Sequence, residues 1–168
     1  YRYPIKSAAA QSIRKAQLGP LGLEGDRQMV LASPDGRFVT ARECPRLARI
    51  HWVDSALEFC GQRSPAVTFA GDDQAVSIWK RTQSGVPASA AVNDWLGEVL
   101  EQPVTLMQLP SIESQHYGDS QPVMLLFRET AQRIERALGR PFSALQLRPN
   151  LVIDGGEAFT EKTLTTLQ

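Results

Sequence analysis

Residues 27–42 read RQMVLASPDGRFVTAR, and this stretch decides the fold that the sequence predicts. Two apolar runs lie on either side of SPDG at 33–36. A Pro-Asp-Gly turn between such runs is typical of a β-hairpin, because Pro presets its own φ and Gly accepts a positive φ. The stretch therefore predicts a hairpin within a β-rich first part of the chain.

Further short β runs lie on both sides of this hairpin. Before it, Tyr1, Tyr3 and Ile5 alternate as in a half-buried strand, and the glycines of 19–25 predict a turn-rich connection. After it come four short runs, ARIHWV (48–53), LEFC (57–60), AVTF (66–69) and VSIW (76–79). Short strands at this spacing favour a β-barrel or a curled antiparallel sheet.

The pattern changes to a helical one near residue 88. Apolar residues at positions 92, 95, 96, 99 and 100 form one stripe of an amphipathic helix, with Ser89 as a candidate N-cap and Pro103 forbidding continuation. A second helix is predicted from Ala131, Ile134 and Leu138, which share a face, and is ended by a Gly-Arg-Pro sequence at 139–141. The sequence thus predicts an α+β, β-rich protein with one or two helices in its first part.

The remaining strands are expected at 104–109, 122–127, 151–154 and 164–168. Between the first two, the polar, turn-rich segment 110–121 is predicted to be a linker or mobile loop. The chain opens inside a predicted strand without an initiator Met and stops inside another. We therefore expect further residues before and after it.

Composition excludes several classes of function. The chain has 168 residues, 42% hydrophobic and 21% charged, and its 18 basic residues balance its 18 acidic ones. This neutrality gives no electrostatic case for nucleic acid or an acidic membrane surface, and no apolar run approaches the roughly 18 residues of a membrane span. Cys44 and Cys60 are too few for a disulfide framework or a zinc site. Both are expected to be buried thiols of a cytoplasmic protein, and no metal site built from the chain's own side chains is expected.

Basic residues lie at the ends of several predicted strands, namely Lys6, Arg27, Arg42, Arg46 and Arg148. If they gather at one mouth of a barrel, the matching ligand is an oxyanion, because a guanidinium binds phosphate and carboxylate through two parallel hydrogen bonds. Ser7, Thr40 and Asn150 would add polar groups. The alternative for each cation is a solvated surface residue, and Asp26 beside Arg27 could form only a local ion pair.

The two histidines invite a hydrolytic interpretation that the pattern does not favour. Ser114, His116 and Asp119 could be drawn as a triad, but they lack a nucleophile-elbow context. His51 and His116 lack metal-ligand spacing relative to the cysteines. Neither a GxGxxG nor a P-loop motif occurs.

Several segments together resemble one family. They are YPIKS (3–7), LGPLGLEGDRQMVL (18–31), DGRFVTARECPRLARI (35–50), NDWLGEVL (93–100) and LRPNLVIDG (147–155). In this order they resemble proteins with a β-barrel MOSC N-terminal domain followed by a MOSC domain, which include the mitochondrial amidoxime-reducing component and bacterial reductases of N-hydroxylated bases. The resemblance covers most of the chain. It implies a β-barrel-like domain at 1–110, then a linker and the first part of an incomplete second barrel at 111–168.

The resemblance also implies a cofactor and its contacts. A molybdenum cofactor (molybdopterin) is expected in the full-length protein, with Lys6, Ser7, Arg27, Arg148 and Asn150 matching the family's cofactor residues. Thr130 is a weaker match, and Arg42 is included as a further cofactor-binding cation. The cysteine thiolate that binds molybdenum is expected beyond Gln168, so the catalytic residue is not in this chain. Expected partners are a small N-hydroxylated substrate and an electron-donor protein or domain, with no nucleic acid and no membrane.

Two alternatives to an oxidoreductase remain open. One is a non-catalytic binding module for a sulfur or cofactor carrier, because the thiolate is missing and MOSC domains are fused to sulfur-transferring enzymes. Pyridoxal phosphate is not expected there, since none of the four lysines (Lys6, Lys15, Lys80 and Lys162) has a Schiff-base context. The other is single-strand nucleic-acid binding with Trp52 and Trp79 as stacking platforms. Their apolar surroundings favour core packing instead.

Overall fold

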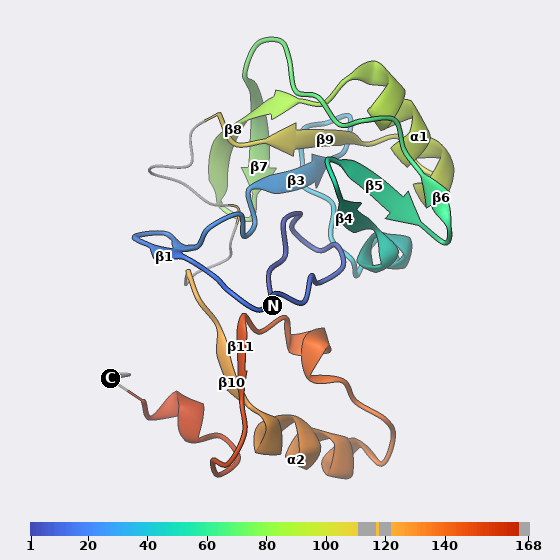
Figure 1. The fold of residues 1–168 in the computed structure, drawn as a ribbon. Helices are drawn as coiled ribbons and strands as arrows, with labels where there is room; N and C mark the ends of the chain where they lie inside the picture. Colours follow the sequence, from blue (N-terminus) through green and yellow to red (C-terminus); the bar gives the residue numbers. More distant parts are fainter. Residues whose placement is uncertain (111–116, 118–121, 165–168) are drawn as a thin grey trace. The chain divides into compact units, whose positions relative to one another are not determined.

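The computed structural model describes residues 1–110, 117 and 122–164. The chain folds into two compact units, Arg2–Ser120 and Gln121–Gln168, the second of which also includes Tyr1. Figure 1 draws the larger unit in blue to yellow-green and the smaller one in orange to red. The larger unit is β-rich with a curled, half-barrel sheet, as the sequence predicts.

The larger unit holds two sheets and a small hairpin. The four-stranded antiparallel sheet has the order β3 (Met29–Ala32), β9 (Thr105–Gln108), β8 (Arg81–Pro87) and β7 (Gln74–Ile78). The three-stranded sheet consists of β4 (His51–Val53), β5 (Ala56–Phe59) and β6 (Gln62–Arg63). The separate hairpin pairs β1 (Leu18–Gly19) with β2 (Gly22–Leu23). All these strand pairs are antiparallel. Two-residue turns connect β1 with β2, β4 with β5, β5 with β6 and β7 with β8, whereas α1 lies between β8 and its neighbour β9.

The predicted turn at 33–36 is confirmed, but its second arm is shorter than expected. Backbone N–H groups of Ser33 and Gly36 donate to Arg37 and Ser33 carbonyls, both at 2.8 Å. Beyond the turn, Phe38 bridges Ala32 and the Val39 N–H donates to the Leu31 carbonyl of β3, while the Phe38 N–H donates to Ser77 of β7. This segment therefore connects two strands of the sheet and is not a regular strand itself.

Two other predicted strands are also reduced to isolated bridges. In the opening segment the only such pairings are Arg2 with Gln11 and Ile5 with Met29, although Tyr3 and Ile5 are almost fully buried. Phe69 likewise forms a single bridge, to Ala88. The alternation at the start of the chain correctly indicates burial but not a strand.

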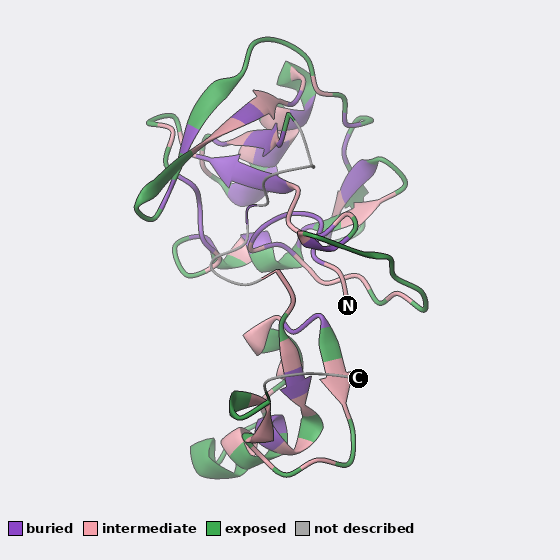
Figure 2. Cartoon of the chain, turned by 90° about the vertical axis from the view of Figure 1, so that its left-hand side faces the viewer, coloured by how far each residue is buried: buried purple, intermediate pink, exposed green. Residues whose placement is uncertain are grey.

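The first predicted helix is confirmed as α1 (Ala90–Leu100). Its apolar stripe is buried in the larger of two core clusters found among the described residues, which also includes Leu47 of the short 3-10 helix η1 (Pro45–Arg49). Figure 2 shows buried residues, in purple, along the central strands of the larger unit. Ser89 is at the N-cap position without a side-chain capping bond, and the helix ends at Glu101 in a left-handed conformation. The second cluster lies on the four-stranded sheet and includes Val30, Val76 and Tyr117.

Gly97 in the middle of α1 is a position where a side chain should help. An added Cβ would find its nearest contact at 3.7 Å, an ordinary van der Waals distance. Glycine in a helix interior is less favourable than alanine because it loses more backbone entropy. We expect Gly97→Ala to stabilise the protein by about 0.5–1 kcal/mol in urea unfolding. A destabilised variant would mean that this part of the helix packs more tightly than the structure indicates.

The smaller unit pairs β10 (Leu125–Phe127) with β11 (Leu151–Ile153) in parallel and carries three short helices. These are α2 (Arg128–Leu138), η2 (Ala144–Leu147) and η3 (Thr160–Lys162). The helix α2 is predicted correctly and ends at Gly139 in a left-handed conformation, but Leu138 on its predicted apolar face is 47% exposed. Residues 111–116 and 118–121 of the predicted linker and residues 165–168 of the predicted last strand lie outside the described part of the chain. None of the helices described is long and apolar enough to cross a membrane.

Candidate functional site

Lys6 and Arg27 lie on two neighbouring backbone segments of the larger unit. The Arg27 N–H donates to the Tyr3 carbonyl at 2.7 Å, and the Lys6 N–H donates to the Met29 carbonyl at 2.8 Å. The Met29 N–H in turn donates to the Pro4 carbonyl at 3.0 Å. This short parallel pairing puts two of the cations that the sequence predicts on neighbouring segments, although they are 21 positions apart along the chain.

A largely buried ion pair orients the Arg27 side chain. Its guanidinium hydrogen-bonds the Asp26 carboxylate, and the two side chains are only 16% and 4% exposed. The same carboxylate accepts a hydrogen bond from the Tyr3 N–H at 2.7 Å, and the guanidinium carbon lies 4.7 Å from the centre of the Tyr3 ring. The local Asp26–Arg27 ion pair is therefore present. Because it is largely buried, removing one partner should destabilise the fold more than breaking a surface ion pair does.

Lys6 and Ser7 occupy a turn next to this pair. Lys6 is 6% exposed, and its ammonium nitrogen lies 5.4 Å from the centre of the Phe38 ring. Ser7 and Arg27 both have a positive φ, 69° and 47°. Non-glycine residues are uncommon in this conformation, and such residues cluster at ligand sites. Lys6 and Arg27 thus lie on two paired backbone segments, with Ser7 next to Lys6 in the chain.

Arg42 lies beyond a pair of aromatic rings. The Phe38 ring that Lys6 contacts meets the Trp79 ring edge-to-face at 4.9 Å, and the Arg42 guanidinium carbon lies 5.6 Å from the centre of the Trp79 ring. These three residues border an open pocket of about 390 Å³, which is also lined by Arg37, Thr40, Glu43 and Ser77. Arg42 and Lys6 thus contact different rings of this aromatic pair.

Glu43 ties this loop together. Its carboxylate accepts hydrogen bonds from the Arg37 guanidinium at 2.6 Å and from the Thr40 N–H and hydroxyl at 3.2 and 3.0 Å. The Arg37 hydrogen bond first, and those of Thr40 next, lower the pKa of Glu43 below its ordinary value. The Arg37–Glu43 pair leaves no net charge of its own in the pocket.

The lowered pKa of Glu43 predicts a pH-dependent contribution to stability. A carboxyl group whose pKa is lower in the folded state stabilises the fold above its unfolded pKa, and this contribution is lost as pH falls through the folded pKa. We expect Glu43→Gln to be less stable than the wild type at neutral pH, and the difference to vanish in acid. Urea unfolding of the wild type and the variant at a series of pH values from neutral to acid measures this difference in stability. Substitution of the exposed Glu98 by Gln is the control. A difference that did not change with pH would contradict the assignment.

The predicted residues of the smaller unit hold its backbone together. Asn150 is 1% exposed, and its side chain accepts from the Met124 N–H at 3.0 Å and donates to the Tyr1 carbonyl at 3.3 Å. The Thr130 hydroxyl accepts from the Phe159 N–H at 2.7 Å and donates to the Glu161 carboxylate at 3.0 Å. Arg148 follows η2 with a positive φ of 57°, two residues before Asn150.

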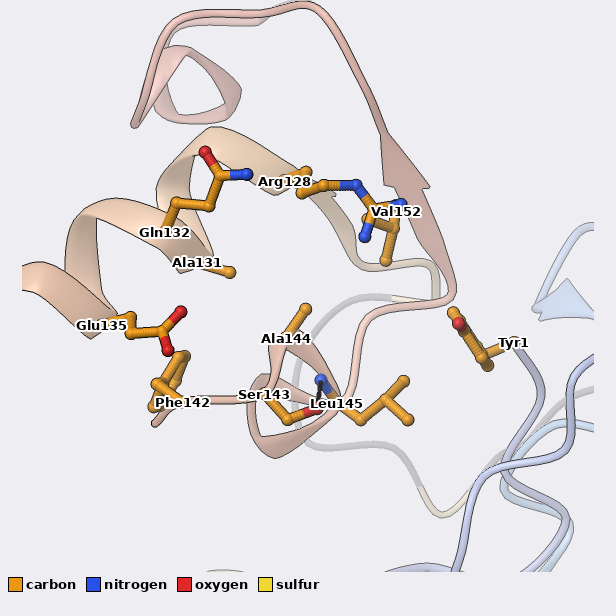
Figure 3. Close-up of a pocket in the computed structure, with 10 residues that line it drawn as sticks. All are labelled: Tyr1, Arg128, Ala131, Gln132, Glu135, Phe142, Ser143, Ala144, Leu145 and Val152. Atoms are coloured by element: carbon orange, nitrogen blue, oxygen red, sulfur yellow. Dashed lines mark hydrogen bonds between the residues drawn. The ribbon is translucent and has the colours of Figure 1, made fainter. Parts of the chain in front are cut away.

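A second pocket, of about 330 Å³, lies in the smaller unit between α2 and η2 (Figure 3). Figure 3 shows Arg128 and Gln132 from α2 on one side and Ser143 and Leu145 on the other. Arg128 pairs with the exposed Asp154, whose pKa this hydrogen bond lowers. The pocket contains none of Thr130, Arg148 and Asn150.

Two expectations drawn from apolar context need correction. Cys60 is exposed at the tip of the β5–β6 hairpin, whereas Cys44 is buried as expected. Trp79 is 56% exposed rather than packed in the core, because it forms the tip of the β7–β8 hairpin. Ser114, His116 and Asp119 lie outside the described residues. In the part of the chain that is described, no three His, Cys, Asp or Glu side chains could hold a metal ion.

Tyr117 is a residue of this region that sequence reasoning missed. Its N–H donates to the Arg27 carbonyl at 2.8 Å, and its hydroxyl donates to the Ser84 carbonyl at 2.9 Å. Burial, and then the charge of Asp73, raises the pKa of Tyr117, which keeps the hydroxyl protonated as a donor. The one feature of the sequence that could have indicated its burial is that Tyr117 is a lone aromatic residue within a polar segment.

Family models match nearly the whole chain. A model for the MOSC N-terminal beta barrel domain matches residues 1–103, and one for the MOSC domain matches residues 113–167. The chain belongs to the MOSC N-terminal beta barrel family. This confirms the resemblance inferred from the sequence motifs.

Curated relatives of this MOSC protein carry two kinds of name. Mitochondrial amidoxime-reducing component 1 of Danio rerio is 27% identical over 190 residues, covering 96% of this chain and 58% of the relative. The protein of that name from Xenopus laevis is 25% identical, covering 95% and 55%. Molybdenum cofactor sulfurase of Drosophila erecta is 26% identical, covering 98% and 24%. The chain thus spans little more than half the length of the first two relatives and about a quarter of the third.

Proposed function

We propose that this MOSC chain is the cofactor-binding part of a molybdenum-cofactor-dependent oxidoreductase that reduces N-hydroxylated compounds. Amidoxime-reducing relatives, similar over 95% or more of the chain, support the reaction class. The observation that carries the proposal is the Lys6–Ser7–Arg27 cluster, in which two little-exposed cations and a hydroxyl lie on paired segments. Both Ser7 and Arg27 adopt positive φ values.

The chemistry of this cluster fits a phosphate-bearing pterin. Ammonium and guanidinium groups bind oxyanions by charge-assisted hydrogen bonds, and partial burial strengthens them because less water screens the charges. In our proposal Lys6, Ser7 and Arg27 hold the cofactor, and Asp26 and Tyr3 orient Arg27. The bound molybdenum would supply the two-electron reduction of the N–O bond.

The other predicted contacts have weaker support. Cofactor contacts for Arg148, Asn150 and Thr130 stay predictions, and the side chains of Asn150 and Thr130 hydrogen-bond to backbone groups within the smaller unit. A cofactor contact for Arg42 stays a prediction, since Arg42 and Lys6 contact different rings of the Phe38–Trp79 pair. The electron donor, the thiolate beyond Gln168 and a cytoplasmic location also stay predictions.

Retention of cofactor tests the proposal. We would purify the gene product that contains this chain from cells that make the cofactor, then measure molybdenum and pterin per protein. Lys6→Met and Arg27→Gln should each reduce retained pterin by about tenfold to a hundredfold, since each removes a charge-assisted hydrogen bond. Arg49→Gln is the matched control, because Arg49 is exposed and stacks on Phe59 at 5.4 Å in the same unit. A folded wild type without pterin, or equal retention in all variants, would refute the proposal.

A sulfur-carrier or cofactor-carrier module is the second candidate, favoured by the sulfurase relative that matches 98% of the chain. The two candidates differ in turnover. A reductase that retains its cofactor should reduce an N-hydroxylated amidine with a chemical electron donor. A binding module should retain the cofactor and yield no amidine.

A further inference from the structure

Within the described part of the chain, Arg42 has no acidic partner, a feature that it shares with Arg49. Arg37, Arg46 and Arg63 each pair with a carboxylate. Among the residues that the structure describes, none forms an ion pair with Arg42, and its guanidinium lies over the Trp79 ring. Because Glu43 is neutralised by Arg37, the pocket that Arg42 borders carries a net positive charge. This charge favours an anionic ligand.

Trp79 occupies a position that local structure does not explain. It is the first residue of the two-residue turn between β7 and β8, with a φ of 54°. Such turns prefer Asn, Asp or Gly, because a bulky residue is strained at a positive φ. The side chain is nevertheless 56% exposed, so burial in the core does not offset this cost. Observed strain of this kind is a basis for proposing a binding role.

The aromatic rings and the cation together define a ligand. Phe38 is 4% exposed, lines the pocket and contacts the Trp79 ring edge-to-face. An Arg held against an aromatic ring can still bind a carboxylate bidentately through its planar N–H edge. The volume of about 390 Å³ is within the range of small-molecule sites.

We propose that the Phe38–Arg42–Trp79 pocket binds a small planar aromatic carboxylate. The carboxylate pairs with Arg42, and the ring of the ligand packs against Trp79 and Phe38. The site requires no molybdenum, so it can be tested separately from the proposed function by using the chain without any cofactor.

Benzoate is the probe, and the indole N–H signals of the tryptophans in a ¹⁵N-labelled protein are the readout. Trp79→Leu assigns the Trp79 signal. We expect benzoate to shift this signal saturably and to leave those of Trp52 and Trp95 unchanged. Arg42→Gln should weaken benzoate binding by about tenfold, because it removes a charge-assisted pair. Arg42→Lys should also weaken it, since Lys keeps the charge but not the planar fork.

Matched ligands and a matched variant decide the outcome. Arg49→Gln, which removes another exposed, ring-stacked arginine, should leave benzoate affinity unchanged. Benzamidine tests the charge preference, and cyclohexanecarboxylate tests the preference for a planar ring. No saturable shift, equal binding by Arg42→Gln, or tighter binding of benzamidine would overturn the proposal. If cyclohexanecarboxylate binds as tightly as benzoate, the proposed preference for an aromatic ring is wrong.

Discussion

Replacing Gly85 by alanine is expected to destabilise the protein by about 3 kcal/mol, as overpacking of a tight core does. Gly85 lies in β8, where a Cβ would come within 2.7 Å of the Tyr117 hydroxyl and 2.9 Å of the Met107 Cβ. Both neighbours are buried in the second core cluster, so neither can move away into solvent. Urea unfolding should show a lower midpoint with an unchanged slope.

A double-mutant cycle shows whether overlap with the Tyr117 hydroxyl causes the destabilisation by Gly85→Ala. Tyr117→Phe alone should cost about 1 kcal/mol, because it leaves the Ser84 carbonyl without its donor. In that background Gly85→Ala should cost at least about 1 kcal/mol less than in the wild type, since the overlap with the hydroxyl is gone. Additive effects would exclude the Tyr117 contact as the source, and an undisturbed Gly85→Ala protein would contradict the packing altogether. Gly97→Ala, with its open surroundings, is the control for the substitution itself.

The sequence predicts the turns and helices of this protein better than it predicts which β runs pair as strands. The turn at 33–36 and the helices α1 and α2 are found where propensity and periodicity indicate them, because those signals depend on neighbouring residues. Where β runs are short, long-range partners decide which become strands. Residues 37–39 divide their bonds between β3 and β7, and the opening segment forms isolated bridges, so neither is a regular strand.

The candidate site was predictable in its cations and not in its aromatic residues. Strand-end position and the family motifs pointed to Lys6, Ser7 and Arg27, and backbone pairing puts Lys6 and Arg27 on neighbouring segments, while their role in cofactor binding stays a prediction. The contacts of Trp79 could not be inferred, because its apolar neighbours in sequence indicate burial while the hairpin register puts it at the tip. Tyr117 escaped notice since no local pattern connects it with Arg27 and Ser84, which are 90 and 33 positions away.

Removing the Asp26 carboxylate should have the largest effect on both stability and the site. Asp26→Ala leaves the Tyr3 N–H without its acceptor and the Arg27 guanidinium without its counter-charge, in surroundings that are mostly buried. Breaking a buried pair by removing one partner typically costs about 3–5 kcal/mol. Asp26→Asn should cost less, since an amide oxygen can still accept from Tyr3 while the charge is lost.

The Arg128–Asp154 pair supplies the matched control, because it joins the same two residue types on the surface, with side chains 52% and 68% exposed. Asp154→Asn should therefore change the free energy of unfolding much less than Asp26→Asn. Similar effects of the two substitutions would show that burial does not strengthen the Asp26–Arg27 pair. If Asp26 orients Arg27 for an oxyanion, Asp26→Asn should also lower pterin retention under conditions where the protein remains folded, whereas a purely structural role would lower stability alone.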